Sequence, residues 1–409
     1  MFNKTKLFED EYFCGFNSGS DEFDALVAAQ NQMEAETTWE EGISDLEVLP
    51  LADPMEVEVR YHDPSNTVPK EILLDTCDNS GILLSYGGKI SCLRSCAMPS
   101  LLNTAGISGP GVGRAKKENL ASGLSAFLSD SRQESRIMTR AGKISAVVSK
   151  QYEYMPISEL LGICEELEDT FGVMFFRGGS IAHDLTTAAF AFPDVAPQIT
   201  AAYNSVLTNA GRPNSKELLV PVVQFRASDT SSEAAKLTTI LKMGGQMVPI
   251  GGFKVPHVAP LEYDQNHNRI SCIDKFRQEA GTLFSKFEYD IKDLLPRMLD
   301  TEIHYPGNCF VGLCKYTGIP QKWGGIIEEN LRNDWPDHSG CSFLDVYEAL
   351  TEVTALAIRD GLAPYSSRIL DLEEGIAKVS RNKASWTKYD LPGTVAWGQK
   401  VPMQSRSIT

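Results

Sequence analysis

Residues 136–172 read RIMTRAGKISAVVSKQYEYMPISELLGICEELEDTFG, and this stretch decides the fold class that we expect. Two extended segments, 136–139 and 144–149, flank Ala141-Gly142, where glycine allows the tight reversal of a β-hairpin. Pro156 then opens a helix that Gly172 closes. The helix presents one apolar face, which consists of Ile157, Leu160, Leu161, Cys164, Leu167 and Phe171.

Further extended runs follow this helix, at 173–177, 180–192, 218–226 and 246–250. A hairpin, a helix and then several strands are typical of an antiparallel sheet covered by helices, and not of a doubly wound parallel sheet. We therefore expect an α+β fold with a mainly antiparallel sheet and packed helices.

From residue 271 the apolar residues recur with helical spacing, and a helical C-terminal domain is predicted there. Ser342 is the predicted N-cap of a helix over 343–359, because its hydroxyl can accept a hydrogen bond from the first helical turn. The predicted organisation is an acidic, flexible arm over 1–55, an α+β domain over 56–265, a helical domain over 266–395 and a tail over 396–409.

The charge of the 409 residues is distributed unevenly around a net value of −16. Residues 1–60 carry 15 acidic and three basic side chains, whereas residues 86–150 carry ten basic and three acidic ones. We call residues 86–150 the basic block. An acidic arm can cover such a block or repel the wrong partners from it, or it can simply keep the protein in solution. The overall negative charge excludes a uniformly basic coat for nucleic acid.

Composition narrows the cellular setting that we expect. No apolar run approaches the roughly 18 residues of a membrane span, and the acidic N-terminus lacks the character of a signal peptide. Nine cysteines at irregular spacings fit reduced thiols better than a disulfide framework. We therefore expect a cytoplasmic protein, in the host cell if a phage encodes it, with no membrane partner.

Several segments resemble a known family. They are MTRAGKISAVVSKQYEYMPISELLGICEEL (138–167), FRGGSIAHDLTTAAFAF (176–192), FRASDTSSEAAKL (225–237), HYPGNCFVGLCKYTGIPQKW (304–323) and SFLDVYEALTEVTALA (342–357). Over residues 86–395 the chain resembles a family of phage- and plasmid-borne proteins described mainly as a domain of unknown function. The resemblance implies a setting on mobile elements and prophages, and no particular reaction.

The strongest functional pattern is a set of cations with aromatic side chains between them. Single-stranded nucleic acid is bound in this way, with cations along the phosphates and rings stacked on the bases. Tyr152 and Tyr154 would share one face of an extended segment. The alternative is that these rings fill the core and the cations are ordinary surface. The candidate nucleic-acid-binding residues are Arg114, Lys116, Lys117, Arg136, Arg140, Lys143, Lys150, Tyr152, Tyr154 and Arg177.

Other patterns are weaker indications of a phosphate, metal or catalytic site. The glycines at 106–113 match neither a P-loop nor a dinucleotide motif and indicate a linker. The spacing of Cys92, Cys96, Cys309 and Cys314 lacks the pairs of a structural zinc site, so we assign no metal and no cofactor. The hydroxyl-rich segment 228–233 predicts a helix cap ahead of 234–237 rather than a nucleophile. No catalytic residue is assigned.

The sequence thus predicts a phage or plasmid accessory protein that binds single-stranded nucleic acid in support of recombination or strand annealing. The alternative is a non-enzymatic protein that inhibits or redirects a host DNA-processing factor through its acidic arm. A host protein and further copies of this chain are additional candidate partners. Whether the protein is an enzyme stays open, although the sequence favours a protein without catalysis. His183 and Asp229 would be the first residues to test for it.

Overall fold

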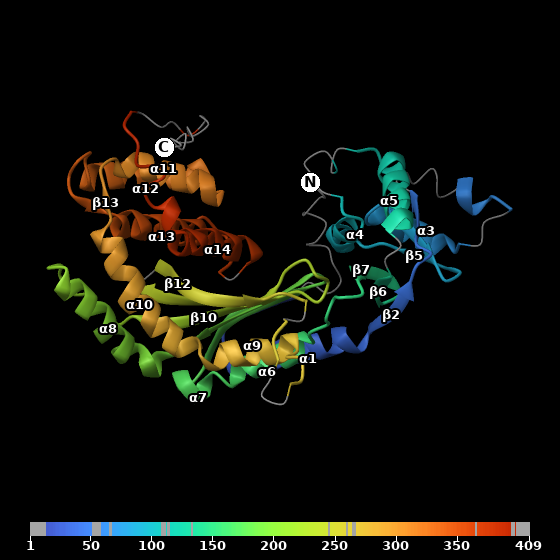
Figure 1. Cartoon of the computed structure of the whole chain (residues 1–409), viewed down its shortest axis with the longest axis horizontal. Coiled ribbons are helices and arrows are strands. Elements are labelled where there is room, and N and C mark those ends of the chain that lie inside the picture. The colour runs from blue at the N-terminus through green and yellow to red at the C-terminus, as the bar shows by residue number, and fades with distance from the viewer. Residues whose placement is uncertain are drawn as a thin grey trace.

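The computed structural model describes residues 14–50, 59–64, 68–107, 112, 115–131, 134–243, 246–258, 261–263, 267–364, 366–393 and 397. Figure 1 shows a larger part, built around a long sheet, and a smaller part beside it along the longest axis of the molecule. Antiparallel sheets and packed helices make up both parts, so the expected α+β class is confirmed.

A six-stranded sheet runs through the larger part. Its strands, in spatial order, are β1 (Cys14–Phe16), β8 (Phe175–Ala182), β9 (Leu185–Ala191), β10 (Val220–Ala227), β11 (Ala235–Met243) and β12 (Gln246–Val255). Every neighbouring pair is antiparallel. The turn after residue 228 leads into β11 and not into a helix, so the predicted helix cap in this segment is wrong. Residues 221–227 of β10 and 235–241 of β11 are all buried, and this packing inside the sheet outweighs the local capping pattern.

Helices pack along this sheet and form one hydrophobic cluster with it. They are α1 (Ser20–Ala35), α6 (Ile157–Glu165), α7 (Glu168–Phe171), α8 (Ala196–Asn209), α9 (Cys272–Gly281) and α10 (Leu283–Asp300). The predicted helix over 157–171 is present as α6 and α7, which are separate elements on either side of residues 166–167. Gly172 ends α7 with φ of 79°, a conformation that glycine adopts without strain.

The C-terminal helices lie above the sheet in Figure 1. They are α11 (Pro306–Thr317), α12 (Gln321–Asp334), α13 (Phe343–Arg359) and α14 (Ser367–Arg381), and the short strands β13 (Glu302–Ile303) and β14 (Cys341–Ser342) pair beside them. The predicted helix over 343–359 is confirmed, with Ser342 and Asp345 forming a reciprocal capping box. These helices share the hydrophobic cluster of the large sheet. The hydrophobic core therefore continues across the predicted domain boundary at 265/266.

The smaller part contains two three-stranded sheets and its own hydrophobic cluster. One sheet has the order β2 (Thr37–Ile43), β6 (Ser135–Arg140) and β7 (Lys143–Ser149); the other has the order β3 (Glu47–Pro50), β4 (Ile82–Tyr86) and β5 (Lys89–Cys92). Helices α3 (Lys70–Asp78), α4 (Met98–Thr104) and α5 (Lys117–Ser131) complete it. The hairpin of β6 and β7 confirms the predicted one, and its turn residues Ala141 and Gly142 both have positive φ.

The structure corrects the prediction of a flexible acidic arm. Residues 14–50 supply strands to all three of these sheets, and only residues 1–13 and 51–55 of the predicted arm lie outside the described residues. Helix α1 buries Phe23, Leu26 and Met33 in the main hydrophobic cluster. Three apolar side chains on one face anchor a 16-residue helix when a sheet is there to receive them, whatever the charge on the opposite face.

Candidate functional site

The cations of the basic block meet carboxylates from other parts of the chain. Strand β2 lies at the edge of its sheet and brings Glu40 and Glu41 beside the block. Lys89 Nζ lies 2.8 Å from Glu40 Oε2, and Arg136 Nη2 lies 2.5 Å from Glu41 Oε1. Arg136 also donates to the carbonyl oxygen of Tyr152 at 2.6 Å. Part of the acidic N-terminal segment thus neutralises part of the block.

Arg140 is not available to a ligand in this conformation. Its side chain is fully buried and forms an ion pair with the carboxylate of Asp229, itself 1% exposed. It also donates from Nε to Thr37 Oγ1 at 2.9 Å and from Nη1 to the His183 carbonyl oxygen at 3.0 Å. The prediction that Arg140 contacts nucleic acid is therefore corrected: it joins β6 of the smaller part to the loop after β10 of the large sheet.

The two tyrosines differ in their surroundings. Tyr152 is 5% exposed, lies between Trp39 (ring centroids 5.6 Å apart) and His257 (4.7 Å), and donates its hydroxyl to the Asp229 carbonyl oxygen at 2.7 Å. Its predicted role as a platform for bases is corrected, because both faces of its ring are already stacked. Tyr154 is half-buried, and its ring centroid lies 5.5 Å from that of Trp39.

The remaining predicted cations are dispersed. Lys116 is exposed, whereas Lys117 is half-buried and donates to the carbonyl oxygen of Ser80, and burial lowers its pKa. Lys143 lies 3.4 Å from the carboxylate of Asp75. Lys150 lies 3.9 Å from that of Glu134, with both side chains largely exposed. Arg114 lies outside the described residues.

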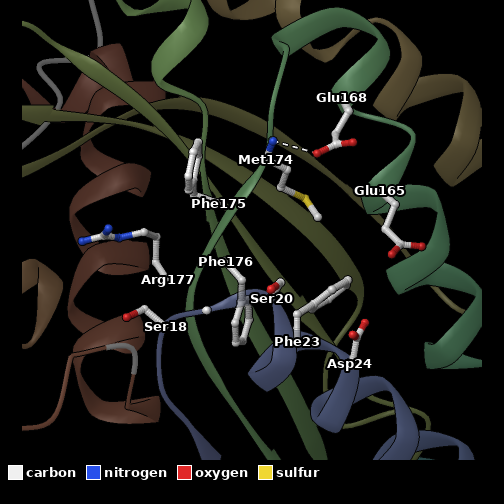
Figure 2. A pocket seen from close by; sticks show the side chains of 11 residues that line it. Ser18, Ser20, Phe23, Asp24, Glu165, Glu168, Met174, Phe175, Phe176 and Arg177 are labelled. Carbon is white, nitrogen blue, oxygen red and sulfur yellow. Dashed lines mark hydrogen bonds between the residues drawn. The ribbon is translucent and has the colours of Figure 1, made fainter.

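Arg177 stands apart from the block, on β8 of the large sheet, where it lines a pocket of about 580 Å³. Figure 2 shows this pocket. The first turn of α1, the end of α6, α7 and the start of β8 surround it. The lining residues are Ser18, Gly19, Ser20, Phe23, Asp24, Glu165, Glu168, Met174, Phe175, Phe176 and Arg177.

The pocket combines apolar side chains with an acidic wall. Phe23 and Phe176 contact each other with ring centroids 5.3 Å apart, and Phe175 is 51% exposed. Burial raises the pKa of Glu165, and the nearby charges of Asp24 and Glu168 raise it further. In Figure 2 the Arg177 guanidinium extends away from this wall, and Arg177 lies on the large sheet, apart from the basic block. Its contact with nucleic acid stays a prediction.

The motifs in the sequence did not indicate this pocket. Its acidic residues come from two segments about 140 positions apart, 18–24 and 165–177, and the first of these falls in the segment predicted as a flexible arm. The amphipathic pattern of Phe23 and Leu26 was the available clue, because it predicts a helix that packs against something.

The described residues contain neither a group of side chains placed to hold a metal ion nor a helix that could span a membrane. Within them, no group of three or more His, Cys, Asp or Glu side chains is placed to hold a metal ion. Of the eight cysteines whose side chains the structure describes, all except Cys14 are buried. None of the described helices is both long enough and apolar enough to cross a lipid bilayer.

Comparisons with known proteins do not assign this chain to a family. No family model matches the chain, and neither a curated protein nor a solved structure matches it.

Proposed function

We propose that the protein binds single-stranded nucleic acid through the basic block and that strand β2 competes with the phosphates for it. The observation that carries this proposal is the pair of contacts from Glu40 and Glu41 of β2 to Lys89 and Arg136. A carboxylate that pairs with a basic side chain takes the position at which a phosphate oxygen would bind. The mobile-element setting and a role in recombination or annealing stay predictions.

The exposure of these contacts supports exchange with a ligand. One partner of each pair is largely exposed, Glu41 at 67% and Lys89 at 61%, whereas Arg136 and Glu40 are 21% and 32% exposed. Exposed ion pairs contribute only about 0–1 kcal/mol, so exchanging a carboxylate for a phosphate costs little. The ladder between β2 and β6 is also irregular between Glu40 and Ile43, where Gly42 has φ of 70°. A bulge at the edge of a sheet weakens the pairing of that strand locally.

The rings beside Arg136 favour a single strand over a duplex. Tyr152 stacks on the Trp39 ring and the Arg136 guanidinium lies 5.6 Å from its centroid, so we expect the half-buried Tyr154 ring to receive a base. Stacking on such rings requires bases that are free of a partner strand. Lys116 and Lys150, which are exposed and belong to the basic block, would contact further phosphates of the strand.

The test is fluorescence anisotropy with a labelled single-stranded oligonucleotide and the Glu40→Gln/Glu41→Gln variant. We expect tighter binding by this variant and weaker binding by Lys116→Glu/Lys150→Glu. Raising salt from about 50 to about 200 mM should weaken every complex, because binding releases counterions. Point substitutions replace a deletion of 1–55, since that deletion would remove β1, α1, β2 and β3 from the fold.

The matched control is Asp169→Asn/Glu217→Gln, which makes the same change in net charge at exposed positions outside the block. Tighter binding by this control would show a general charge effect and contradict the competition by β2. No binding by any variant at low salt would remove nucleic acid as the ligand. The alternative, a protein that acts on a host factor through its acidic segment, would then be the function to pursue.

A further inference from the structure

We propose that the pocket between α1, α7 and β8 is a docking site for a basic peptide, with a lysine or arginine side chain against Asp24 and Glu165 and an apolar neighbour on Phe175. This inference is independent of the proposed binding of nucleic acid. The site lies on the large sheet, whereas the basic block lies mainly in the smaller part.

The cavity has the size and composition of a binding site. Its volume of about 580 Å³ accommodates a long side chain together with part of its backbone. In Figure 2, Phe23 and Phe176 lie next to each other in the lower half of the view, and Met174 and Phe175 lie above them. Apolar and aromatic walls with a few charged groups are typical of ligand pockets.

The acidic wall lacks a cation of its own. Asp24 and Glu165 are exposed, and neither carboxylate forms a hydrogen bond or an ion pair with another described residue. In Figure 2 both carboxylates lie on one side of β8, and the Arg177 guanidinium extends from the other side, away from them. Arg277 pairs instead with the neighbouring Glu166 at 3.3 Å. Charge complementarity therefore favours a cationic ligand.

The carboxylates repel one another, and a bound cation would relieve that repulsion. Glu168 accepts a hydrogen bond from the Met174 backbone at 2.8 Å and is held at the pocket. Burial raises the pKa of Glu165, and the charges of Asp24 and Glu168 raise it further. A ligand ammonium or guanidinium beside them would stabilise the ionised forms.

The rim of the pocket favours a peptide over a free amine. Phe175, the first residue of β8, lines the pocket and is 51% exposed, and Val173, two residues before it, is 53% exposed. A small amine would occupy the acidic wall and leave this apolar surface in water. A peptide can cover it with a second side chain, and large exposed side chains next to a pocket are typical of protein-binding surfaces.

The experiment measures anisotropy of a labelled peptide that carries lysine and leucine separated by glycine and serine. We expect binding that weakens at least about tenfold in Asp24→Asn/Glu165→Gln, a loss that fits one or two charge-assisted contacts. Phe175→Ser should also weaken it, and a peptide with glutamate in place of lysine should not bind. All three positions are exposed, so the variants should keep the circular dichroism spectrum of the native protein.

The control is Asp169→Asn, which removes an exposed carboxylate next to Glu168 but outside the pocket, and it should leave binding unchanged. Absence of binding to the lysine peptide, or equal weakening by this control, would overturn the proposal. Free cadaverine, which has an ammonium and an apolar chain but no peptide, should compete poorly. Competition as strong as that of the peptide would overturn the choice of a peptide and identify a small-amine site.

Discussion

Glu373 of α14 should make the stability of the fold depend on pH near neutrality. Its side chain is 2% exposed and accepts a hydrogen bond from Gln224 Nε2 of β10. Burial raises the pKa of Glu373 from 4.5 to about 7, although Gln224 and the charge of Arg226 both act against the increase. A carboxyl group in this position is therefore held preferentially in its protonated form.

The size of the effect follows from this pKa. A tenfold change in proton affinity is worth about 1.4 kcal/mol, so ionising Glu373 in the folded protein costs about 3 kcal/mol. The folded state binds more protons than the unfolded state between pH 4.5 and about 7. The contribution of Glu373 to the free energy of unfolding is therefore fully present below this window, falls as pH rises through it and stays lower above it.

Glu373→Gln should remove this dependence, because the amide oxygen can still accept the hydrogen bond from Gln224 and carries no charge. The assay is urea denaturation of the native protein and the variant at a series of pH values. At about pH 8 the variant should be more stable by about 3 kcal/mol, and near pH 4.5 the two should agree. A difference that is the same at both ends of the series would refute the assignment.

Glu374, the next residue of α14, supplies a control of opposite sign. Burial alone would raise its pKa, but hydrogen bonds and charges from Lys236 and Lys378 outweigh burial and hold the pKa at about 2. Its ionised form thus stabilises the fold above about pH 4.5, and this stability is lost as pH falls towards 2. Glu374→Gln should lower the free energy of unfolding at neutral pH, where Glu373→Gln raises it.

Three further predictions concern the fold. Arg140→Met should lower the free energy of unfolding by about 3–5 kcal/mol, because it leaves the Asp229 carboxylate buried without its partner. In urea denaturation, Arg140→Met/Asp229→Leu should recover most of this loss. A smaller loss in the single variant than in the double variant would contradict the pairing. Gly252→Ala should cost about 1–3 kcal/mol and lower the melting temperature, since its Cβ would lie 2.2 Å from a carbonyl oxygen of β11; an unchanged temperature would show that the strands can separate. Ser342→Ala should cost about 1 kcal/mol, whereas Ser366→Ala, at an N-cap without a side-chain hydrogen bond, should cost less, and equal costs would exclude capping as the cause.

Elements governed by neighbours in the chain were predictable. The hairpin of β6 and β7 follows from the turn at Ala141-Gly142, and α13 follows from its cap and its apolar periodicity. Turn chemistry and capping act within a few residues, so the sequence is enough to detect them. The break between α6 and α7, by contrast, has no signal in the uninterrupted apolar face of 157–171.

The accessibility of the candidate residues was not predictable in the same way. Alternation along an extended segment places Tyr152 and Tyr154 on one side, but it does not say whether that side faces solvent or another ring. Trp39 and His257, more than 100 positions away from Tyr152 along the chain in either direction, decide the answer by stacking on it. The dispersed basic block has the same origin, because Glu40, Glu41, Asp75 and Asp229 all reach it from outside.

The sequence by itself determined the α+β class, the hairpin and the helices of the C-terminal region, since hydrophobic periodicity and local hydrogen bonding are written into neighbouring residues. Only the tertiary structure decided that the acidic segment 14–50 is folded and that Arg140 forms a buried ion pair with Asp229. It also decided that segments 18–24 and 165–177, which are distant along the chain, form an acidic pocket. The reason is physical: burial and Coulomb interactions depend on which groups lie within a few ångströms of one another, and distance along the chain does not specify this separation.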